Sequence, residues 1–195
     1  MHQEENDRTM IETAVQAQTR YTYNNAYLYA IEYQCQQPKL LAFLDLANIE
    51  PGHNVLELGC GPAWLGTHAV DQATPGRMGR VDCSAPMLQQ AQAFAARNGV
   101  SKEVEFYQGD ITDLPGIPEL QRTQWFAGFD RILVHRVLLM LGSYSHVLKH
   151  WARYLGPGGQ IIADMWHPSK CVGACSMAVA REPAVKRVTI ENKAA

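Results

Sequence analysis

From residue 54 onward, short apolar segments alternate along the chain with longer segments of helical periodicity. Strands that alternate with helices form right-handed βαβ units, and these build a parallel sheet that carries helices on both faces. The alternation therefore predicts an α/β fold with a mostly parallel sheet. The expected strands are residues 54–58, 77–82, 104–108, 131–134 and 160–165, and the clearest expected helices are residues 86–98 and 143–154.

Proline and glycine separate these segments and mark where the sheet begins and ends. Glu-Pro-Gly-His at 50–53 precedes the first expected strand, and Leu-Gly-Pro-Gly-Gly at 155–159 predicts the end of a helix and the start of the last strand. Residues 8–48 carry apolar side chains at helical spacing, divided by Pro38. We therefore expect one domain, made of an N-terminal helical segment (1–48) and a core (49–195) that contains the sheet.

The composition limits the size of the fold and the class of partner. A chain of 195 residues with 47% hydrophobic residues can bury one substantial core. The formal net charge of −2 provides no excess of positive charge for binding nucleic acid or an anionic membrane. No apolar segment reaches the about 18–20 residues that a membrane-spanning helix needs, so we expect neither nucleic acid nor membrane as a partner.

The N-terminus and the cysteines indicate a cytoplasmic protein. The first residues, MHQEENDR, are polar and acidic, unlike a signal or transit peptide. The five cysteines are an odd number without the spacing of a disulfide framework, which is typical of a reducing compartment. Cys171 and Cys175 lie four residues apart near His167, but no second pair completes a metal site, so we expect reduced thiols and no metal.

The first strand–helix junction has the sequence ELGCGPAW, at residues 57–64. In open α/β sheets, ligands bind at the carboxyl ends of the strands, which is where this junction lies. Gly59 and Gly61 let the backbone turn tightly and approach a ligand, and the helix that follows directs N–H groups and its positive dipole end toward it. A dinucleotide-binding motif would have a third glycine at position 64, and the indole of Trp64 obstructs the close helix–strand packing that this glycine permits.

An acidic residue followed by Gly-x-Gly after a hydrophobic strand resembles motif I of the class I S-adenosylmethionine-dependent methyltransferases. The resemblance implies a Rossmann-like fold and S-adenosylmethionine as the cofactor. It implies further that Glu57 meets the methionine amino group, and that the backbone of Gly59, Cys60 and Gly61 lines the cofactor. The third glycine of the family motif is Ala63 here, a small residue that fits unless this position needs a positive φ.

The second junction, VDCSAPML at residues 81–88, resembles the family's second motif. Asp82 ends the expected strand about twenty residues after the glycines, where a carboxylate can accept hydrogen bonds from both ribose hydroxyls. Asp82 or Ser84 can instead cap the following helix, and the two roles are compatible. The resemblance implies that Cys83 and Met87 flank the adenine, while a place in the hydrophobic core is the alternative for Met87.

The third and fourth junctions supply further residues of the predicted site. The resemblance implies that Asp110 accepts the adenine amino group and that the Ile111 N–H reaches a ring nitrogen, the alternative for Asp110 being an Asx turn. It also implies that the Val134 carbonyl accepts from the methionine amino group. His135 then lies beside the reacting methyl group as a general base or an orienting group, or else is a surface or capping histidine. His167, after the last expected strand, is a second catalytic candidate.

Residues 20–29 contain an unusual number of tyrosines. The resemblance implies that an N-terminal helix covers the cofactor as a lid. A tyrosine in this helix, with Tyr21, Tyr23 and Tyr27 as the candidates, can stack on the cofactor or donate a hydrogen bond to its methionine carboxylate. The alternative is that these tyrosines pack the helix onto the sheet. An aromatic lid would also exclude water and line an apolar pocket for a small-molecule substrate.

The segment after the last expected strand is short for this family, whose sheet usually ends in an antiparallel hairpin. Residues 185–191 form the only other strand-like run, so we expect shortened C-terminal strands, which a homodimer or a partner subunit can complete. The first hypothesis is a methyltransferase that transfers a methyl group in line to a small molecule. The alternatives are a cofactor-binding but catalytically incomplete partner subunit and, disfavoured by Trp64, a nicotinamide-dependent oxidoreductase.

Overall fold

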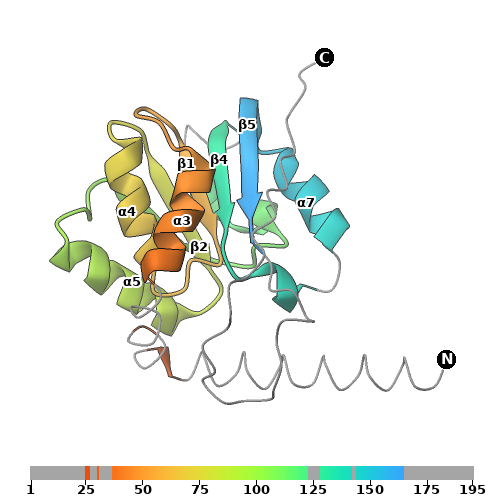
Figure 1. Cartoon of the computed structure of the whole chain (residues 1–195). Helices are drawn as coiled ribbons and strands as arrows, with labels where there is room; N and C mark the ends of the chain where they lie inside the picture. The colour runs from red at the N-terminus through yellow and green to blue at the C-terminus, as the bar shows by residue number, and fades with distance from the viewer. Residues whose placement is uncertain (1–24, 27–29, 31–36, 123–127, 142–143, 165–195) are drawn as a thin grey trace, which may run out of the picture.

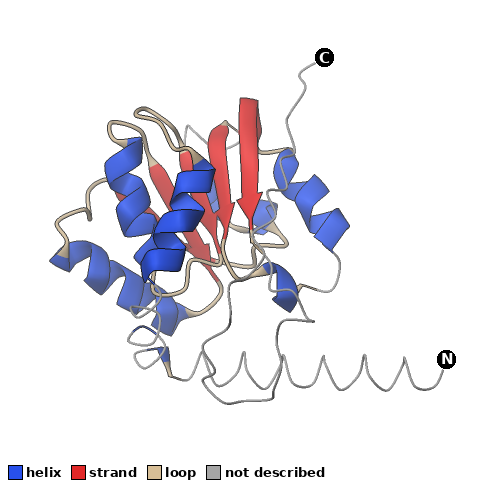
Figure 2. Ribbon diagram, viewed as in Figure 1, coloured by secondary structure: helices blue, strands red, loops and turns tan. Residues whose placement is uncertain are grey.

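The computed structural model describes residues 25–26, 30, 37–122, 128–141 and 144–164 (Figure 1). In these ranges the chain forms a five-stranded sheet in the order β3-β2-β1-β4-β5, and neighbouring strands are parallel. Helices cover both faces of the sheet (Figure 2). In chain order the elements are α3 (Gln37–Ala47), β1 (Val55–Leu58), α4 (Trp64–Ala73), β2 (Met78–Asp82), α5 (Ala85–Arg97), β3 (Val104–Gln108), the 3-10 turn η1 (Leu114–Gly116), α6 (Pro118–Gln121), β4 (Phe129–Val134), the 3-10 turn η2 (Leu138–Met140), α7 (Tyr144–Ala152) and β5 (Leu155–Ala163).

The parallel sheet confirms the fold class that the alternating segments predict. Strands β1 to β4 begin and end within two residues of the expected strands, and β3 has the expected bounds. α3 begins at Gln37, so Pro38 falls in its first turn, where a missing N–H removes no helical hydrogen bond.

Among the residues described, none of the helices combines the length and the apolar character needed to cross a membrane.

The last strand is longer than the sequence predicts. β5 begins at Leu155 rather than at residue 160, because Leu155 pairs with Phe129 of β4 before the register shifts and Gln160 pairs with Arg131. The glycine- and proline-rich residues between Leu155 and Gln160 bulge out of the ladder, with Gly158 at a φ of +76°. The expected break therefore lies inside β5 and does not precede it.

Two hydrophobic clusters lie on the two faces of the sheet, and side-chain alternation along β1 assigns its residues to them. Leu56 and Leu58 belong to the cluster that also contains Trp151 of α7. Val55, on the opposite face, belongs to the cluster that contains Phe43 of α3 and side chains of α4. α4 therefore covers one face of the sheet and α7 covers the other (Figure 2). The chain passes from the first face to the second in the connection between β3 and β4.

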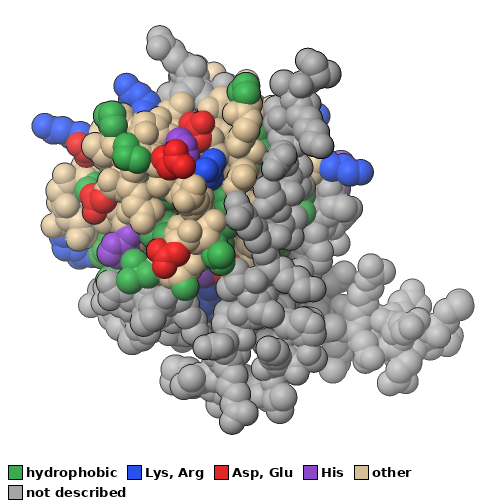
Figure 3. Space-filling model, turned by 45° about the horizontal axis from the view of Figure 1, so that its top comes forward, with side chains coloured by type: hydrophobic (Ala, Val, Ile, Leu, Met, Phe, Trp, Pro, Cys, Tyr) green, Lys and Arg blue, Asp and Glu red, His purple; other side chains and the backbone are tan. Residues whose placement is uncertain are grey.

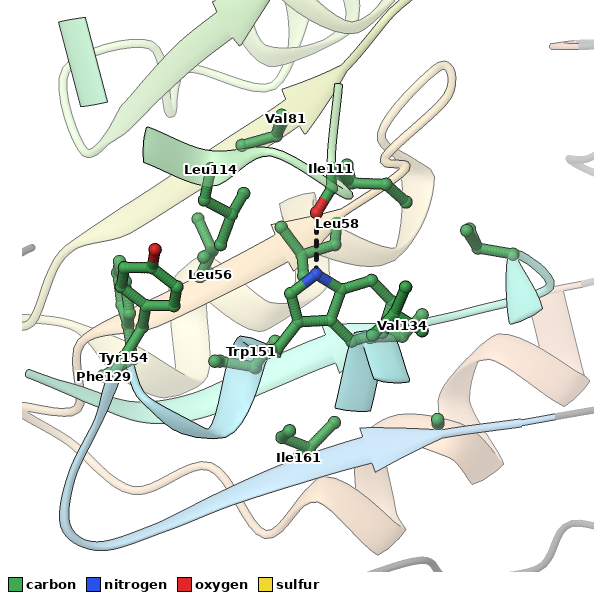
Figure 4. Close-up of a cluster of buried hydrophobic side chains, with 14 of the residues drawn as sticks. Leu56, Leu58, Val81, Ile111, Leu114, Phe129, Val134, Trp151, Tyr154 and Ile161 are labelled. Carbon is green, nitrogen blue, oxygen red and sulfur yellow. Dashed lines mark hydrogen bonds between the residues drawn. The ribbon is translucent and has the colours of Figure 1, made fainter. Parts of the chain in front are cut away.

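Trp151 links α7 to the loop that follows β3. Its side chain is fully buried, and its Nε1–H donates a hydrogen bond to the Ile111 carbonyl at 2.7 Å. Figure 4 shows the indole among the side chains of the sheet, with this hydrogen bond directed at Ile111. The contact satisfies the one polar group of a large buried ring and fixes the loop after β3 at the carboxyl edge of the sheet.

The face covered by α4 contains a buried ion pair between β1 and β2. Glu57 and Arg80 are partners in the parallel ladder, and their side chains are 4% and 0% exposed, with Oε2 of Glu57 3.6 Å from Nε of Arg80. Nη1 of Arg80 also donates to the Ala63 carbonyl at 3.4 Å, and the guanidinium lies over the Phe106 ring. Burial raises the pKa of Glu57 to about 7, against the lowering effect of the Arg80 charge.

Helix α4 approaches this ion pair at Gly66. A Cβ atom at this position would overlap Nε of Arg80 and Oε2 of Glu57. Glycine in a helix interior costs about 1 kcal/mol relative to alanine, but here any side chain would have to displace the two charged groups. Gly66 is therefore required by the packing beneath the helix.

Replacing Gly66 with alanine is expected to lower the free energy of unfolding by about 1–3 kcal/mol, the usual cost of overpacking a core. At an ordinary helix position the same substitution would raise the free energy of unfolding, so the expected change has the opposite sign. Urea unfolding followed by circular dichroism measures the change. In the background of Glu57→Leu and Arg80→Leu, whose shorter side chains make room for the methyl group, the substitution should cost little; an equal cost in both backgrounds would contradict the contact.

The stability of the chain should also depend on pH through Glu57. Its folded pKa of about 7 lies above the 4.5 of an exposed glutamate, so the folded chain binds one more proton between these values. The resulting stabilisation is full below pH 4.5 and is lost as the pH rises through 7, a fall of about 3 kcal/mol over the whole range. Urea unfolding at pH 5 and pH 8 measures this fall. The Glu57→Gln variant cannot titrate at this position, so the fall in its free energy of unfolding between pH 5 and pH 8 should disappear. A variant that shows the same fall as the native chain would mean that Glu57 is ionised throughout this range.

Candidate functional site

The site predicted from the sequence lies at the carboxyl edge of the sheet. β1 is flanked by β2 on one side and by β4 on the other, so the order of the strands reverses between β1 and β4. In open α/β sheets this switch point opens a crevice at the carboxyl ends of the strands, where ligands bind. The ends of β1 to β4 and the segments that follow them carry those predicted site residues that the structure describes.

The parallel register lines up four residues along this edge. If the register of each strand pair is continued past its last paired residues, four residues fall next to one another. They are Asp82 on β2, Gly59 after β1, His135 after β4 and Asp164 after β5. Neighbouring strands lie about 4.8 Å apart, so the row covers three such steps. The side chains of this row lie on the face of the sheet that α3 covers. The His135 ring shows this, because it packs on Phe43 of α3 with the ring centroids 5.1 Å apart.

The glycine-rich loop leaves β1 through three positive φ angles. Gly59, Gly61 and Ala63 have φ values of +69°, +52° and +60°. A Cβ atom on Gly59 would lie 2.5 Å from Cγ2 of Val137, so glycine is needed here for packing as well as for its φ. The position of Ala63 does need a positive φ, so alanine is strained there by about 1–2 kcal/mol. Its methyl group is buried beside Cys60, which offsets part of this cost.

The Asp82 carboxylate ties the glycine-rich loop to the start of α5. Oδ2 accepts a hydrogen bond from the Gly61 N–H and Oδ1 accepts one from the Ser84 N–H, both at 2.8 Å. Ser84 is the N-cap of α5, and its hydroxyl oxygen accepts from the Met87 N–H. Burial raises the pKa of Asp82, and the two N–H donors lower it. Each carboxylate oxygen has a second lone pair, so these bonds leave acceptor sites for further donors.

The residues predicted near the adenine differ in exposure. Met87 is 1% exposed, as its alternative place in the core requires, whereas Cys83 is exposed. Asp110 is exposed and forms the Asx turn, since its Oδ1 accepts hydrogen bonds from the N–H and the hydroxyl of Thr112. Ile111 is held through its carbonyl by α7. The contacts of these residues with adenine stay predictions.

Glu57 and Cys60 point into the protein. The Glu57 carboxylate is paired with Arg80 beneath α4, and the expected contact with the methionine amino group stays a prediction. Cys60 is 4% exposed, and burial raises the pKa of its thiol. Arg80 is not among the residues predicted from the sequence, although a cation in the middle of an expected strand, next to a strand with one acidic residue, is a recognisable signal.

His135 pairs with a carboxylate that the sequence reasoning missed. Nδ1 of His135 lies 2.7 Å from Oδ2 of Asp164, and the two side chains are 7% and 4% exposed. Oδ1 of Asp164 accepts a hydrogen bond from the Arg136 N–H at 2.6 Å. The Asp164 N–H donates to the Val134 carbonyl at 3.2 Å, so this carbonyl already has one donor. The sequence carries no local signal for Asp164, because its place beside His135 follows from the register of β4 and β5.

Tyr21, Tyr27 and His167 lie outside the residues that the structure describes, as do Tyr23 and residues 185–191. The aromatic lid and the second catalytic histidine therefore stay predictions. The completion of the sheet by a second copy or a partner subunit stays a prediction for the same reason.

A model of the methyltransferase domain family matches residues 49–191. An uncharacterized 37.1 kDa protein in transposon TN4556 of Streptomyces fradiae is 35% identical over 123 residues, which are 61% of this chain and 32% of that protein. A malonyl-acyl-carrier-protein O-methyltransferase of Erwinia billingiae is 32% identical over 112 residues, which are 57% of this chain and 38% of that protein. The chain thus spans about a third of the length of these curated relatives.

Solved structures of methyltransferases share the fold. A methyltransferase in complex with the Haloferax volcanii activator Trm112 has a TM-score of 0.62 at 21% identity, over 77% of this chain and 61% of that chain. An S-adenosylmethionine-dependent methyltransferase from Geobacter sulfurreducens, in complex with S-adenosylhomocysteine, has a TM-score of 0.54 at 22% identity, over 68% of this chain and 51% of that chain. Since the family model covers residues 49–191 and the parallel sheet has the expected architecture, the chain belongs to the class I S-adenosylmethionine-dependent methyltransferases.

Proposed function

We propose that this chain binds S-adenosylmethionine at the carboxyl edge of its sheet and directs transfer of the methyl group to a small molecule. The observation that carries the proposal is the row of Asp82, Gly59 and His135 at the switch point. The row combines a carboxylate for ribose hydroxyls, a glycine loop for the methionine end and an imidazole beyond it. Its span, two strand spacings or about 10 Å, suits a nucleoside joined to an amino acid.

The nucleoside would lie over the ends of β2 and β3. Asp82 has a fixed orientation because two N–H groups hold its oxygens, and its remaining lone pairs would accept the ribose hydroxyls. The Ile111 N–H and Asp110 are the proposed partners of the adenine edge, with Cys83 and Met87 on either side of the ring. The Asx turn occupies Oδ1 of Asp110, so Oδ2 would accept the adenine amino group.

The methionine end would lie against the glycine-rich loop. The N–H groups of Gly59 and Cys60 both donate to the Val81 carbonyl. The loop would therefore contact the cofactor through the close approach of its backbone, which the missing Cβ atoms permit, rather than through these N–H groups. The Val134 carbonyl has one backbone donor, and its second lone pair would accept from the methionine amino group.

The remaining task of the protein is to align the acceptor. The cofactor supplies a methyl group already activated by its positively charged sulfur, so orientation is the main contribution of the chain. His135, and His167 outside the described residues, are the proposed groups on the acceptor side. The E. billingiae relative is named an O-methyltransferase, which supports methyl transfer.

The surface charge supports a small molecule as the acceptor. Acidic and basic side chains of the described residues are interspersed on the face shown in Figure 3, and the net charge of the chain is −2. Nucleic-acid binding rests on a concentration of positive charge over one face. These observations favour a small-molecule acceptor over a nucleic acid.

A second function, that of a cofactor-binding partner subunit without methyl transfer of its own, is the alternative. The solved complex with the activator Trm112 supports such assembly for a protein of this fold. A methyl-transfer assay with labelled cofactor over a panel of metabolites distinguishes the two functions.

Isothermal titration calorimetry should show that the chain binds S-adenosylhomocysteine and does not bind NAD. The physical reason is Trp64, which occupies the position where a dinucleotide-binding loop requires a glycine for close helix–strand packing. Binding of NAD together with no binding of S-adenosylhomocysteine would reverse the proposal.

Replacing Asp82 with alanine should weaken the binding of S-adenosylhomocysteine by about 1–3 kcal/mol, the scale of hydrogen bonds to a charged group. Ser84→Ala is the matched control, because it removes the cap of α5 and leaves the carboxylate in place. The control should lower the free energy of unfolding by about 0.5–2 kcal/mol and leave the affinity nearly unchanged. An unaltered affinity in Asp82→Ala would contradict the ribose contact.

The ligand supplies a further control, because Asp82 also holds the loop. The native chain should bind adenosine more tightly than 2′-deoxyadenosine, and Asp82→Ala should bind the two nearly alike. A distorted loop alone would weaken both ligands equally. A preference for adenosine that survives the substitution would assign the ribose hydroxyl to another group.

A further inference from the structure

We propose that Arg80 is a positioning residue for the cofactor, because its guanidinium holds the glycine-rich loop where α4 begins, and that Glu57 acts as its counter-ion. The inference rests on the proposed binding of S-adenosylmethionine and deepens it, since it names the side chain that keeps the loop in shape for the cofactor. It also gives the Glu57 carboxylate a role other than the expected contact with the methionine amino group. The Val134 carbonyl would then be the acceptor for that amino group.

Three consecutive residues of β2 hold the glycine-rich loop at successive points. The Val81 carbonyl accepts hydrogen bonds from the first two N–H groups of the loop, at 2.8 and 3.0 Å. The Asp82 carboxylate accepts one from the Gly61 N–H at 2.8 Å. Nη1 of Arg80 donates to the Ala63 carbonyl at 3.4 Å. Arg80 is thus the side chain that links the last residue of the loop to β2.

Ala63 is the residue of the loop that needs such support. Its φ of +60° is strained for alanine, and alanine has no side-chain acceptor with which to cap α4, whose N-cap it is. Its carbonyl accepts hydrogen bonds from the N–H and the hydroxyl of Thr67, at 3.3 and 3.1 Å. Both of these donors belong to α4, so the carbonyl would lose its link to the sheet if the guanidinium were removed.

Arg80 is unfavourable at this place unless its charge is balanced. The side chain is fully buried, and the guanidinium lies at the N-terminus of α4, the positive end of the helix dipole. Glu57 supplies the opposite charge, with its Oε2 3.6 Å from Nε of Arg80. These two atoms share no hydrogen bond, so their contact is an attraction between charges. The Phe106 ring of β3 adds a cation–π contact, with its centroid 5.4 Å from the guanidinium carbon.

Helix α4 packs directly on the pair. A Cβ atom on Gly66 would overlap Nε of Arg80 and Oε2 of Glu57, so the backbone of α4 covers both atoms. The Glu57 side chain is 4% exposed. A cofactor amino group that took this carboxylate would leave Arg80 as an uncompensated buried charge, which is strongly unfavourable. The packing therefore favours Glu57 as a counter-ion over Glu57 as a ligand of the cofactor.

The two roles of Glu57 predict different responses to a change of ligand. The loop contacts the cofactor through the close approach of its backbone. A displaced loop therefore weakens every ligand that contains the nucleoside and the thioether chain, whatever group the chain carries. A direct contact of Glu57 with the amino group would matter only for ligands that carry this group.

Isothermal titration calorimetry with two ligands tests the proposal. One ligand is S-adenosylhomocysteine, and the other is its analogue with hydrogen in place of the amino group. The titrations are made at pH 8, above the Glu57 pKa of about 7. Glu57→Gln keeps the size of the side chain and removes its charge, so it should weaken the binding of both ligands by the same factor. A loss confined to S-adenosylhomocysteine, or no loss for either ligand, would overturn the proposal.

Substitutions of Arg80 separate the charge from the packing of its stem. Arg80→Met keeps an unbranched apolar chain, and the affinity for both ligands should fall about tenfold, the low end for a hydrogen bond to a charged group. Arg80→Lys keeps a positive charge and should restore part of the affinity. A methionine variant that binds as tightly as the native chain would overturn the proposal, as would a lysine variant that binds no better than the methionine variant.

The double substitution measures whether the two residues act together. In the Arg80→Met background the counter-ion has lost its partner, so Glu57→Gln should cost no further affinity. A further loss as large as that in the native background would mean that Glu57 acts on the ligand independently of Arg80, against the proposal.

Arg131→Met is the matched control for a loss of stability. Arg131 is also buried, and its Nε donates to the Ala47 carbonyl at 2.8 Å, at the end of α3. It pairs with Val55 at the start of β1, far from the glycine-rich loop. The control should lower the free energy of unfolding and leave both affinities unchanged.

The failure of this inference can be told from the failure of the proposed function. A native chain that binds neither ligand overturns the proposed function itself. A native chain that binds S-adenosylhomocysteine, and whose Glu57→Gln variant loses only this ligand, overturns the present inference alone. If the Arg80 variants do not fold, the two ligands still decide through Glu57→Gln.

Discussion

The hydrogen-bonded ladders on the two sides of β1 fix the position of the site. The four residues of β1 are all buried, and a slip of one residue in either ladder would turn its side chains to the opposite faces of the sheet. The register is therefore strongly specified, and the alignment of Asp82, Gly59 and His135 follows from it. These residues stand only one or two positions beyond the last paired residues, so the rigid sheet, rather than a long loop, sets the distances between them.

The ion pair of Glu57 and Arg80 depends on the same register. Two charges in a core carry a desolvation cost, and a buried pair often stabilises a protein no more than apolar side chains would. Here the pair is tied to the geometry of the site, because Arg80 donates to the Ala63 carbonyl where α4 begins, and Asp82 holds the Gly61 N–H on the other side of the loop. Two charged side chains of β2 thus hold the glycine-rich loop at its middle and where α4 begins. A direct contact of Glu57 with the cofactor would compete with this pairing.

Much of the fold could be predicted from the sequence because it depends on local patterns. The apolar segments indicated β1 to β4, and the convergence of strand ends in a parallel sheet located the glycine-rich loop and His135. Contacts between residues far apart in the sequence need the register, so the pairs of Glu57 with Arg80 and of His135 with Asp164 became visible only in the structure. The positive φ of Ala63 and the bulge in β5 depend on the packing of neighbouring strands, which no local pattern encodes.

Two carboxylates with the same local arrangement hold the two loops of the site. Asp82 of β2 accepts the Gly61 N–H in the loop after β1, and Asp164 after β5 accepts the Arg136 N–H in the loop after β4. Both N–H groups belong to residues of positive φ, and a hydrogen bond to a charged group, about 1.5–3 kcal/mol, offsets the strain of such a conformation at Arg136. Each carboxylate uses its other oxygen for a second contact, with α5 in one case and with the imidazole in the other. The loops are therefore ordered before a ligand arrives, and binding does not have to supply the free energy of ordering them.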